Sequence, residues 1–182
     1  MATIWFISDT HFGHANILTF KRADGHLMRT KPGGYPFQDV TEMDEFMIER
    51  WNSVVRAGDK VYHLGDLAMK LAGGIDRIMC RLHGHKRLVR GNHDRLPTKH
   101  YMRWFEEIHG VRIFEGLVLS HVPLHPRSVR GTNVHGHLHS NNLGDPDFAL
   151  PKYLNVSVEC IDYTPISLEE VRATIKAAGG DK

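Results

Sequence analysis

Residues 86–94 read KRLVRGNHD, and the rest of the chain is best interpreted outward from this stretch. A short apolar run stops at Gly91, and an amide, an imidazole and a carboxylate follow at once. This pattern is typical of a strand that ends abruptly in a turn. Gly91 permits backbone conformations that a side chain would forbid. Asn92 then offers a neutral carbonyl oxygen, and His93 offers a ring nitrogen that titrates near neutrality.

Four other predicted strands end in the same kind of residue. They lie at residues 3–8, 60–64, 117–120 and 132–135. The polar residues that follow them are Asp9 and His11, Asp66, His121, and His137 and His139. In open α/β sheets, ligands bind in the crevice beyond the carboxyl ends of the strands. We therefore expect these side chains and Asn92 to meet in one cleft.

Such a cleft would hold imidazoles, carboxylates and an amide but no thiolate, which indicates a metal site with nitrogen and hard oxygen ligands. Seven candidates exceed the three protein ligands that a catalytic zinc usually takes. They suit two ions about 3.5–4 Å apart that share a carboxylate, as in hydrolytic two-metal centres. The i, i+2 spacing of Asp9 with His11, and of His137 with His139, places each pair on one side of an extended segment. Asp66, alone after a glycine, is the expected bridge.

The remaining pattern predicts an α/β layered domain. Helices are expected over residues 41–55, 75–82, 98–108 and 168–178, with Thr41 and Ser167 as the caps of the first and last. Further strands are expected at 111–114 and 154–158, and an exposed loop at 22–37. Strands and helices that alternate first, followed by several strands, favour two sheets with helices outside. The 182 residues fit one domain over positions 1–182.

Net charge, cysteine content and hydropathy narrow the class of protein. A formal charge of +2 is too small for a general polyanion binder, so stable nucleic-acid binding is not expected. Cys80 and Cys160 have no disulfide-like pattern, which favours a reducing cytoplasm. The start, MATIWFISDTH, is a short apolar run without a basic leader, and no later window reaches membrane length. We therefore expect a cytoplasmic protein without a membrane partner, and the oligomeric state stays open.

Five ordered motifs resemble those of a known family. D-x-H at 9–11, G-D at 65–66, G-N-H-D at 91–94, a lone His121 and G-H-x-H at 136–139 resemble the calcineurin-like metallophosphoesterase superfamily. The resemblance extends from Asp9 to Glu159, and the stretches SDTHFGH, VYHLGD and HGHLH are similar to its small bacterial and phage branch. It implies a four-layer α-β-β-α sandwich, in which two mixed sheets are flanked by helices.

Carried over by motif position, the resemblance implies the ligands of two divalent cations. One ion would be held by Asp9, His11, Asp66 and His139, and the other by Asp66, Asn92, His121 and His137. His93 would not be a ligand but would face the scissile phosphate as the catalytic acid. Manganese is the expected metal, and iron, nickel, zinc and magnesium are alternatives because mixed imidazole and carboxylate ligands admit all of them.

Three further residues are candidates for the surroundings of the site. His14 would line the cleft or bind phosphate, and a helix-capping or surface role fits it equally well. Asp94 would orient His93, because residues 67–70 lack the second aspartate that does so in the family's protein phosphatases. Arg127 would pair with a substrate phosphate at the rim, whereas a solvated loop is the more usual explanation for such a residue.

The implied function is metal-dependent hydrolysis of phosphate esters. We expect a phosphodiesterase that acts on a nucleotide or another small ester. One alternative is a phosphomonoesterase, and another is a non-catalytic protein-binding scaffold, because the fold also serves that purpose. A nuclease subunit is disfavoured, since that branch normally carries further domains and the charge of this chain is mild.

Overall fold

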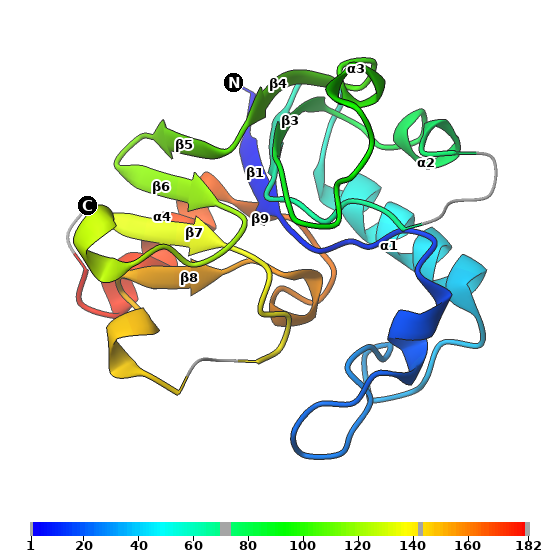
Figure 1. Cartoon of the computed structure of the whole chain (residues 1–182), viewed down its shortest axis with the longest axis horizontal. Coiled ribbons are helices and arrows are strands. Elements are labelled where there is room, and N and C mark those ends of the chain that lie inside the picture. Colours follow the sequence, from blue (N-terminus) through cyan, green and yellow to red (C-terminus); the bar gives the residue numbers. More distant parts are fainter. Residues whose placement is uncertain (1, 70–73, 142–143, 181–182) are drawn as a thin grey trace.

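The computed structural model describes residues 2–69, 74–141 and 144–180, and in it the strands form two sheets (Figure 1). The first sheet has the order β4-β3-β2-β1-β9. Its strands are β1 (Ile4–Ile7), β2 (Lys60–His63), β3 (His85–Val89), β4 (Phe105–His109) and β9 (Ile166–Ser167). β1 to β4 run parallel, so their carboxyl ends lie at one edge, and β9 is antiparallel to β1.

The second sheet has the order β5-β6-β7-β8. Its strands are β5 (Val111–Phe114), β6 (Leu117–Ser120), β7 (Thr132–His135) and β8 (Tyr153–Asn155). β6, β7 and β8 run parallel, and β5 is antiparallel to β6. The α-helices are α1 (Val40–Val54), α2 (Asp76–Met79), α3 (Thr98–Tyr101) and α4 (Leu168–Ala177). The 3-10 helices are η1 (Ala15–Thr19), η2 (Pro126–Ser128), η3 (Pro146–Phe148) and η4 (Val158–Cys160).

The first sheet packs against other elements on both faces, which explains the continuous apolar run of β1. One face packs against α1, where Ile7 of β1 lies in the same core as Met47 and Trp51. The other face contacts the second sheet, and Phe6 of β1 shares that core with Leu119 of β6. Val171 and Ile175 of α4 pack into this second core. The predicted arrangement, two mixed sheets flanked by helices, is confirmed.

The helix predicted over residues 98–108 is wrong. Only α3 is helical there, and residues 105–109 form β4, which pairs in parallel with β3. The side chain of Phe105 is buried in the first core, while Glu107 binds Arg87 across the strands. A short apolar run fits both the 3.6-residue spacing of a helix and the two-residue spacing of a strand. The sequence pattern alone therefore does not separate a helix from an edge strand here. The helix predicted at 75–82 is likewise only the four residues of α2.

The cap of α1 also differs from the prediction. Asp39, rather than Thr41, caps the helix, and its carboxylate accepts a hydrogen bond from the Glu42 backbone at 2.8 Å. Asp44 instead accepts the backbone N–H of Gly13 with both oxygens, at 3.0 and 3.1 Å. This contact ties α1 to the loop after β1. At α4 the predicted Ser167 cap is confirmed.

The segment 22–37 is mostly loop, but it is not exposed throughout, because Arg29 and Phe37 are buried. The strand predicted at 154–158 ends at Asn155, and Val158 begins η4, which carries Glu159. Within the described residues, no helix has the length and apolar character needed to cross a membrane.

Candidate metal centre

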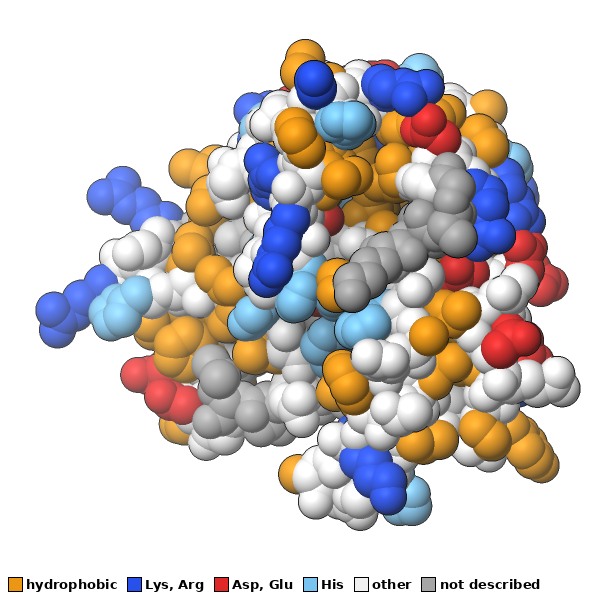
Figure 2. All heavy atoms as spheres, turned by 45° about the vertical axis from the view of Figure 1, so that its right-hand side comes forward, with side chains coloured by type: hydrophobic (Ala, Val, Ile, Leu, Met, Phe, Trp, Pro, Cys, Tyr) orange, Lys and Arg blue, Asp and Glu red, His pale blue; other side chains and the backbone are white. Residues whose placement is uncertain are grey.

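The predicted ligands come together from five loops that lie at the carboxyl ends of strands in both sheets. Because β1, β2 and β3 are parallel, the loops with Asp9, Asp66 and Asn92 leave the first sheet at the same edge. The loops after β6 and β7 reach the same place from the second sheet, and Ser8 donates a backbone hydrogen bond to Val156 where the sheets meet. Figure 2 shows histidine side chains gathered together on this face, with Lys or Arg side chains beside them.

Two motif glycines permit the close approach of these loops. A Cβ atom on Gly91 would lie 2.2 Å from Asp66 Oδ1, and one on Gly136 would lie 2.2 Å from Asp9 Oδ2. Any side chain at either position would therefore displace a predicted ligand.

The backbone at the site is also strained. Five predicted ligands have left-handed φ angles, namely Asp9, His11, Asp66, His137 and His139. Such conformations cost roughly 1–3 kcal/mol each and gather at functional sites. The surrounding structure therefore holds these five side chains in place against a local energetic preference.

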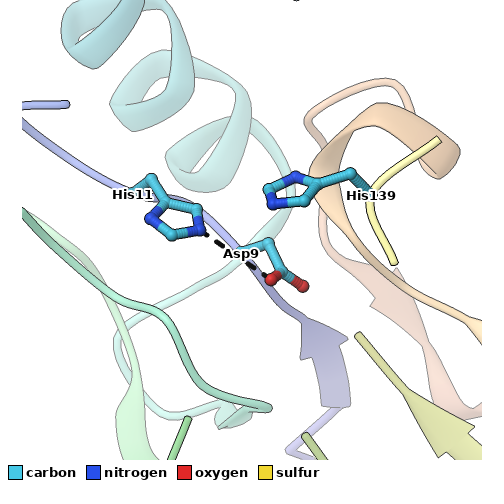
Figure 3. A group of neighbouring side chains, drawn as sticks. All are labelled: Asp9, His11 and His139. Carbon is cyan, nitrogen blue, oxygen red and sulfur yellow. Dashed lines mark ion pairs between the residues drawn. The ribbon is translucent and has the colours of Figure 1, made fainter. Parts of the chain in front are cut away.

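The first ligand group consists of Asp9, His11 and His139, which offer ligand atoms within 4.8 Å of one another (Figure 3). Asp9 Oδ2 accepts hydrogen bonds from the His137 backbone at 2.8 Å and from Ser157 Oγ at 3.0 Å. Within the part of the chain that the structure describes, Asp9 Oδ1 and both ring nitrogens of His11 are, by contrast, buried without a hydrogen-bond partner. Buried polar atoms are nearly always paired, so these atoms fit a cation bound between them.

The protonation of His11 agrees with this fit. Burial, together with the nearby Arg29 charge, lowers the pKa of His11 to about 2, although Asp66 opposes the shift. The ring is therefore neutral near pH 7. A neutral imidazole is the form that binds metal ions, so this ring is ready to act as a ligand without losing a proton.

The second ligand group consists of Asp66, His121 and His137, with Asn92 against it. His121 Nε2 lies 2.8 Å from Asn92 Oδ1, 3.2 Å from His137 Nδ1 and 3.4 Å from Asp66 Oδ2. Four ligand atoms around one zinc at bonding distance would be about 3.4 Å apart, which resembles this spacing. His121 Nδ1 donates to the Leu64 carbonyl at 2.9 Å, which turns Nε2 toward Asp66, Asn92 and His137. These residues also fit a divalent cation.

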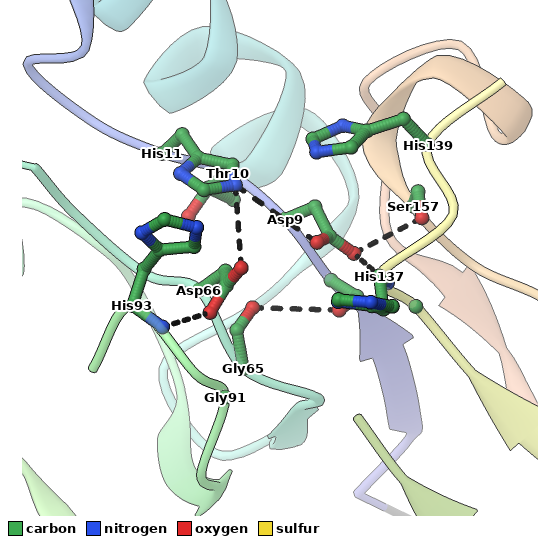
Figure 4. Close-up of polar contacts among 12 residues, drawn as sticks. Asp9, Thr10, His11, Gly65, Asp66, Gly91, His93, His137, His139 and Ser157 are labelled. Atoms are coloured by element: carbon green, nitrogen blue, oxygen red, sulfur yellow. Dashed lines mark hydrogen bonds and ion pairs between the residues drawn. The ribbon is translucent and has the colours of Figure 1, made fainter. Parts of the chain in front are cut away.

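Asp66 of the second ligand group also lies beside His11 of the first (Figure 4). Its Oδ2 atom is 3.5 Å from His11 Nε2 in the first group and 3.4 Å from His121 Nε2 in the second. Burial alone would raise the pKa of Asp66, but the hydrogen bond and charge of His121 outweigh burial and lower it to about 2. One ionised carboxylate oxygen thus faces a ligand of each group.

His93 lies beside the ligands without belonging to either group. Its backbone N–H donates to Asp66 Oδ1 at 2.8 Å, and its ring stands edge-on to that of His11, with 5.4 Å between centroids.

Asp94 plays a different role from the one predicted. Its carboxylate accepts three backbone N–H groups, those of Asp66, Leu67 and Gly91. Among the described residues no hydrogen bond joins it to the His93 ring, so the prediction that it orients this ring is corrected.

The other two candidates lie in different places. His14 is next to the first ligand group, with its ring 5.4 Å from that of His11 and its Nδ1 atom buried without a partner. Arg127 is exposed in η2 and lines a separate hollow with His125 and Lys152. Because β6 and β7 are parallel, their connection runs back from the carboxyl edge and carries Arg127 away from the ligands (Figure 1). The rim position predicted for Arg127 is therefore corrected.

Sequence reasoning missed two buried residues that contact the first ligand group. Arg29 donates from Nε to Glu159 Oε1 at 2.7 Å, and the same oxygen accepts from His139 Nδ1 at 3.0 Å. Burial would raise the pKa of Glu159, but the Arg29 charge and the His139 hydrogen bond lower it to about 2. No local pattern marks an arginine in an irregular loop as buried, so only the three-dimensional structure reveals this pair.

A family model decides the identity of the fold. The model described as calcineurin-like phosphoesterase matches residues 2–167. The chain belongs to this family. The resemblance inferred from the five motifs is thereby confirmed, and membership in the calcineurin-like phosphoesterases supports metal-dependent hydrolysis of phosphate esters.

Relatives of this calcineurin-like phosphoesterase occur in archaea, bacteria and phages. The uncharacterized protein MJ1445 of Methanocaldococcus jannaschii is 37% identical over 93% of this chain and 89% of its own length. The gene 66 protein of Mycobacterium phage L5 is 33% identical over 52% of this chain and 41% of its own. Among solved structures, AQ665 from Aquifex aeolicus, a protein of unknown function, is 27% identical with a TM-score of 0.71, and the match covers 95% of this chain and 99% of that one.

Proposed function

We propose that this protein hydrolyses small phosphodiesters, such as cyclic nucleotides or dinucleotides, at a pair of divalent cations. The observation that supports this most strongly is the position of Asp66 Oδ2, which lies within 3.5 Å of His11 Nε2 and of His121 Nε2. A carboxylate oxygen between two ligand groups is what a shared centre requires.

The residues would divide between the two cations as follows. One cation would be held by Asp9, His11, Asp66 and His139, and the other by Asp66, Asn92, His121 and His137. The chemistry that such a pair supplies is polarisation of the phosphoryl oxygens and activation of a water molecule. Manganese suits the mixed imidazole and carboxylate set, as do iron, nickel, zinc and magnesium.

The role of His93 is to donate a proton to the leaving oxygen. Its ring is partly exposed and lies next to His11, so it can contact a substrate whose phosphate is near the ligands. The bond from its backbone to Asp66 Oδ1 fixes the His93 loop relative to the centre. General acid catalysis of this kind contributes about 10²–10⁴-fold to the rate.

A hollow of about 380 Å³ includes His93 together with Ile75, Arg95 and Leu96. Its volume falls within the range of small-molecule sites. A diester carries two organic substituents on phosphorus, and this hollow can receive one of them beside the proposed acid.

The test is a comparison of two chromogenic esters with the manganese-loaded protein. We expect faster hydrolysis of bis-p-nitrophenyl phosphate than of p-nitrophenyl phosphate, and loss of both activities with a chelator. Faster hydrolysis of the monoester would favour a phosphomonoesterase. If the manganese-loaded protein hydrolysed neither ester nor any nucleotide diester, the proposal of an enzyme would fail and the scaffold alternative would gain support.

A single substitution tests the acid. His93→Ala should lower kcat about 10²–10⁴-fold while the bound manganese stays unchanged, because the ring is not a ligand. The matched control is His26→Ala, since His26 is exposed in the loop before Arg29 and lies outside both ligand groups. Full turnover by metal-loaded His93→Ala would contradict the assigned role.

A further inference from the structure

The buried pair formed by Arg29 and Glu159 has no part in the proposed reaction, yet it contacts the His139 ring and the backbone carbonyls of Asp9 and Thr10. The side chain of Arg29 is 0% exposed and that of Glu159 is 3% exposed. Removing two charges from water is costly, and a buried ion pair is weak evidence for stability alone. Its contacts therefore need another explanation.

Glu159 determines which ring nitrogen of His139 faces the centre. Oε1 of Glu159 accepts from His139 Nδ1 at 3.0 Å, which places the ring proton on Nδ1. The Nε2 lone pair is then left for a cation at Asp9 and His11. A carboxylate that accepts the second N–H of a histidine ligand fixes its tautomer and orientation in many metal sites.

Arg29 holds the backbone on which the other two ligands stand. Its guanidinium donates from Nη1 to the Thr10 carbonyl at 2.8 Å and from Nη2 to the Asp9 carbonyl. These two peptide groups lie between Asp9 and His11, whose φ angles are left-handed at 57° and 46°. A charged donor on both carbonyls stabilises the turn that points these side chains toward one place.

The second ligand group is supported differently. His121 Nδ1 bonds to the backbone carbonyl of Leu64, and Nε2 lies against Asn92 and His137. In the described part of the chain, no ion pair from outside the ligands contacts it.

We propose that Arg29 and Glu159 are positioning residues for the first cation: Glu159 orients His139 through Nδ1, and Arg29 holds both Glu159 and the Asp9–His11 turn. The proposal rests on the two cation sites proposed above. It assigns a purpose to the loop at residues 22–37, which carries the buried Arg29.

Two variants of Glu159 separate positioning from a purely structural role. Both hydrogen bonds end on Oε1, and Oε2 has no hydrogen-bond partner among the described residues. In Glu159→Gln, the amide oxygen can therefore keep both bonds, while the charge is lost and an NH2 group replaces Oε2. In Glu159→Met, a side chain of similar length loses the acceptor altogether. If Glu159 is a positioning residue, Glu159→Met should therefore lose more cation affinity than Glu159→Gln.

The protein offers a matched control with the same types of residue. Arg87 donates to Glu107 Oε1 at 2.9 Å, and His109 Nε2 lies 3.0 Å from Glu107 Oε2. This second Arg–Glu–His arrangement lies on β3 and β4, outside both ligand groups. Glu107→Gln and Glu107→Met should therefore leave cation binding unchanged.

The measurement is calorimetric titration of the apoprotein with Mn²⁺. Wild type should bind two cations, and Glu159→Met should weaken one of the two about 10–100-fold and leave the other unchanged. The affinity of Glu159→Gln for this cation should lie between those of wild type and Glu159→Met. A folded Glu159→Met variant that binds both cations with wild-type affinity would overturn the positioning role. Wild type that binds no cation would instead overturn the proposed function.

A measurement on the wild type covers the case in which Glu159→Met does not fold. In zinc-loaded, ¹⁵N-labelled protein, the His139 signals, assigned by their absence in His139→Gln, should show a proton on Nδ1 and zinc on Nε2. Zinc on Nδ1 of His139 would contradict the proposed orientation by Glu159.

Discussion

The two ligand groups use the same kinds of side chain but are held in different ways. In the first group, Asp9 and His11 are buried, several of their atoms have no partner, and support comes from Arg29 and Glu159 outside the group. In the second group, His137 is exposed and the ligands contact one another. The difference teaches that one centre can combine a site fixed by buried scaffold with a site open to solvent.

The topology explains this asymmetry. The first group stands on the loops after β1 and β7, and the loop after β1 is covered by Arg29 and tied to α1 through Gly13 and Asp44. The second group stands where the loops after β2, β6 and β7 meet, and its other neighbour, Asn92, is itself exposed. We therefore expect the first cation to exchange more slowly than the second.

The largest effect should come from Asp66→Asn, because it removes the only carboxylate that faces both groups within the described residues. Loss of a supporting residue alone costs about 10–100-fold in metal affinity, and loss of this shared charge should cost more than that at both sites. Elemental analysis after equilibrium dialysis would measure the bound metal, with the exposed Asp24→Asn as control. Two bound equivalents in Asp66→Asn would refute the bridge.

His121→Ala should weaken binding of the second cation selectively, because it removes a ligand of the second group only. The second cation should bind at least about 100-fold more weakly, while the first stays bound through its own buried ligands. Titration with Mn²⁺ would report both events. Equal weakening of both cations would mean that the groups are not separately held, and the comparison drawn above would fail.

A smaller effect is expected from Gly136→Ala. The new Cβ would lie 2.0 Å from Ser8 Oγ and 2.2 Å from Asp9 Oδ2, so the first group must shift. Overpacking of this kind lowers the free energy of unfolding by about 1–3 kcal/mol. Urea unfolding of the apoprotein would measure it. Gly110→Ala is the matched control, since nothing lies within 4 Å of its Cβ position, and equal stability of the two variants would argue against the close approach.

The smallest effect concerns the tie between α1 and the first group. Burial raises the pKa of Asp44 to about 6, although the Gly13 N–H opposes the shift. The folded state thus holds this proton more tightly than the unfolded chain, in which an aspartate has its ordinary pKa of 3.8. This contribution to stability is full below pH 4 and is lost as the pH rises through 6.

Asp44→Asn tests that pH dependence. Relative to the variant, wild type should lose about 1–2 kcal/mol of unfolding free energy between pH 4 and pH 6.5, after allowance for solvent screening. Urea denaturation at both pH values measures the difference. If the unfolding free energies of the two proteins change with pH in parallel, Asp44 is not protonated in the folded state. The contact with Gly13 would then be a hydrogen bond to an ionised carboxylate.

The ligands were predictable from the sequence because their placement follows from parallel strands. Asp9, Asp66 and Asn92 each follow a strand, and a strand end fixes which edge of the sheet a loop joins. Arg29 could not be predicted this way, since burial of a loop arginine depends on Glu159 130 residues away. The position of Arg127 required knowledge of the direction of β7, and β4 required the pairing of its neighbour β3.

The most direct test of the central claim is anomalous diffraction at the manganese edge from crystals soaked in Mn²⁺. The account predicts two peaks about 3.5–4 Å apart, one against each ligand group, with the Asp66 carboxylate between them. A single peak, or peaks away from Asp66, would contradict it.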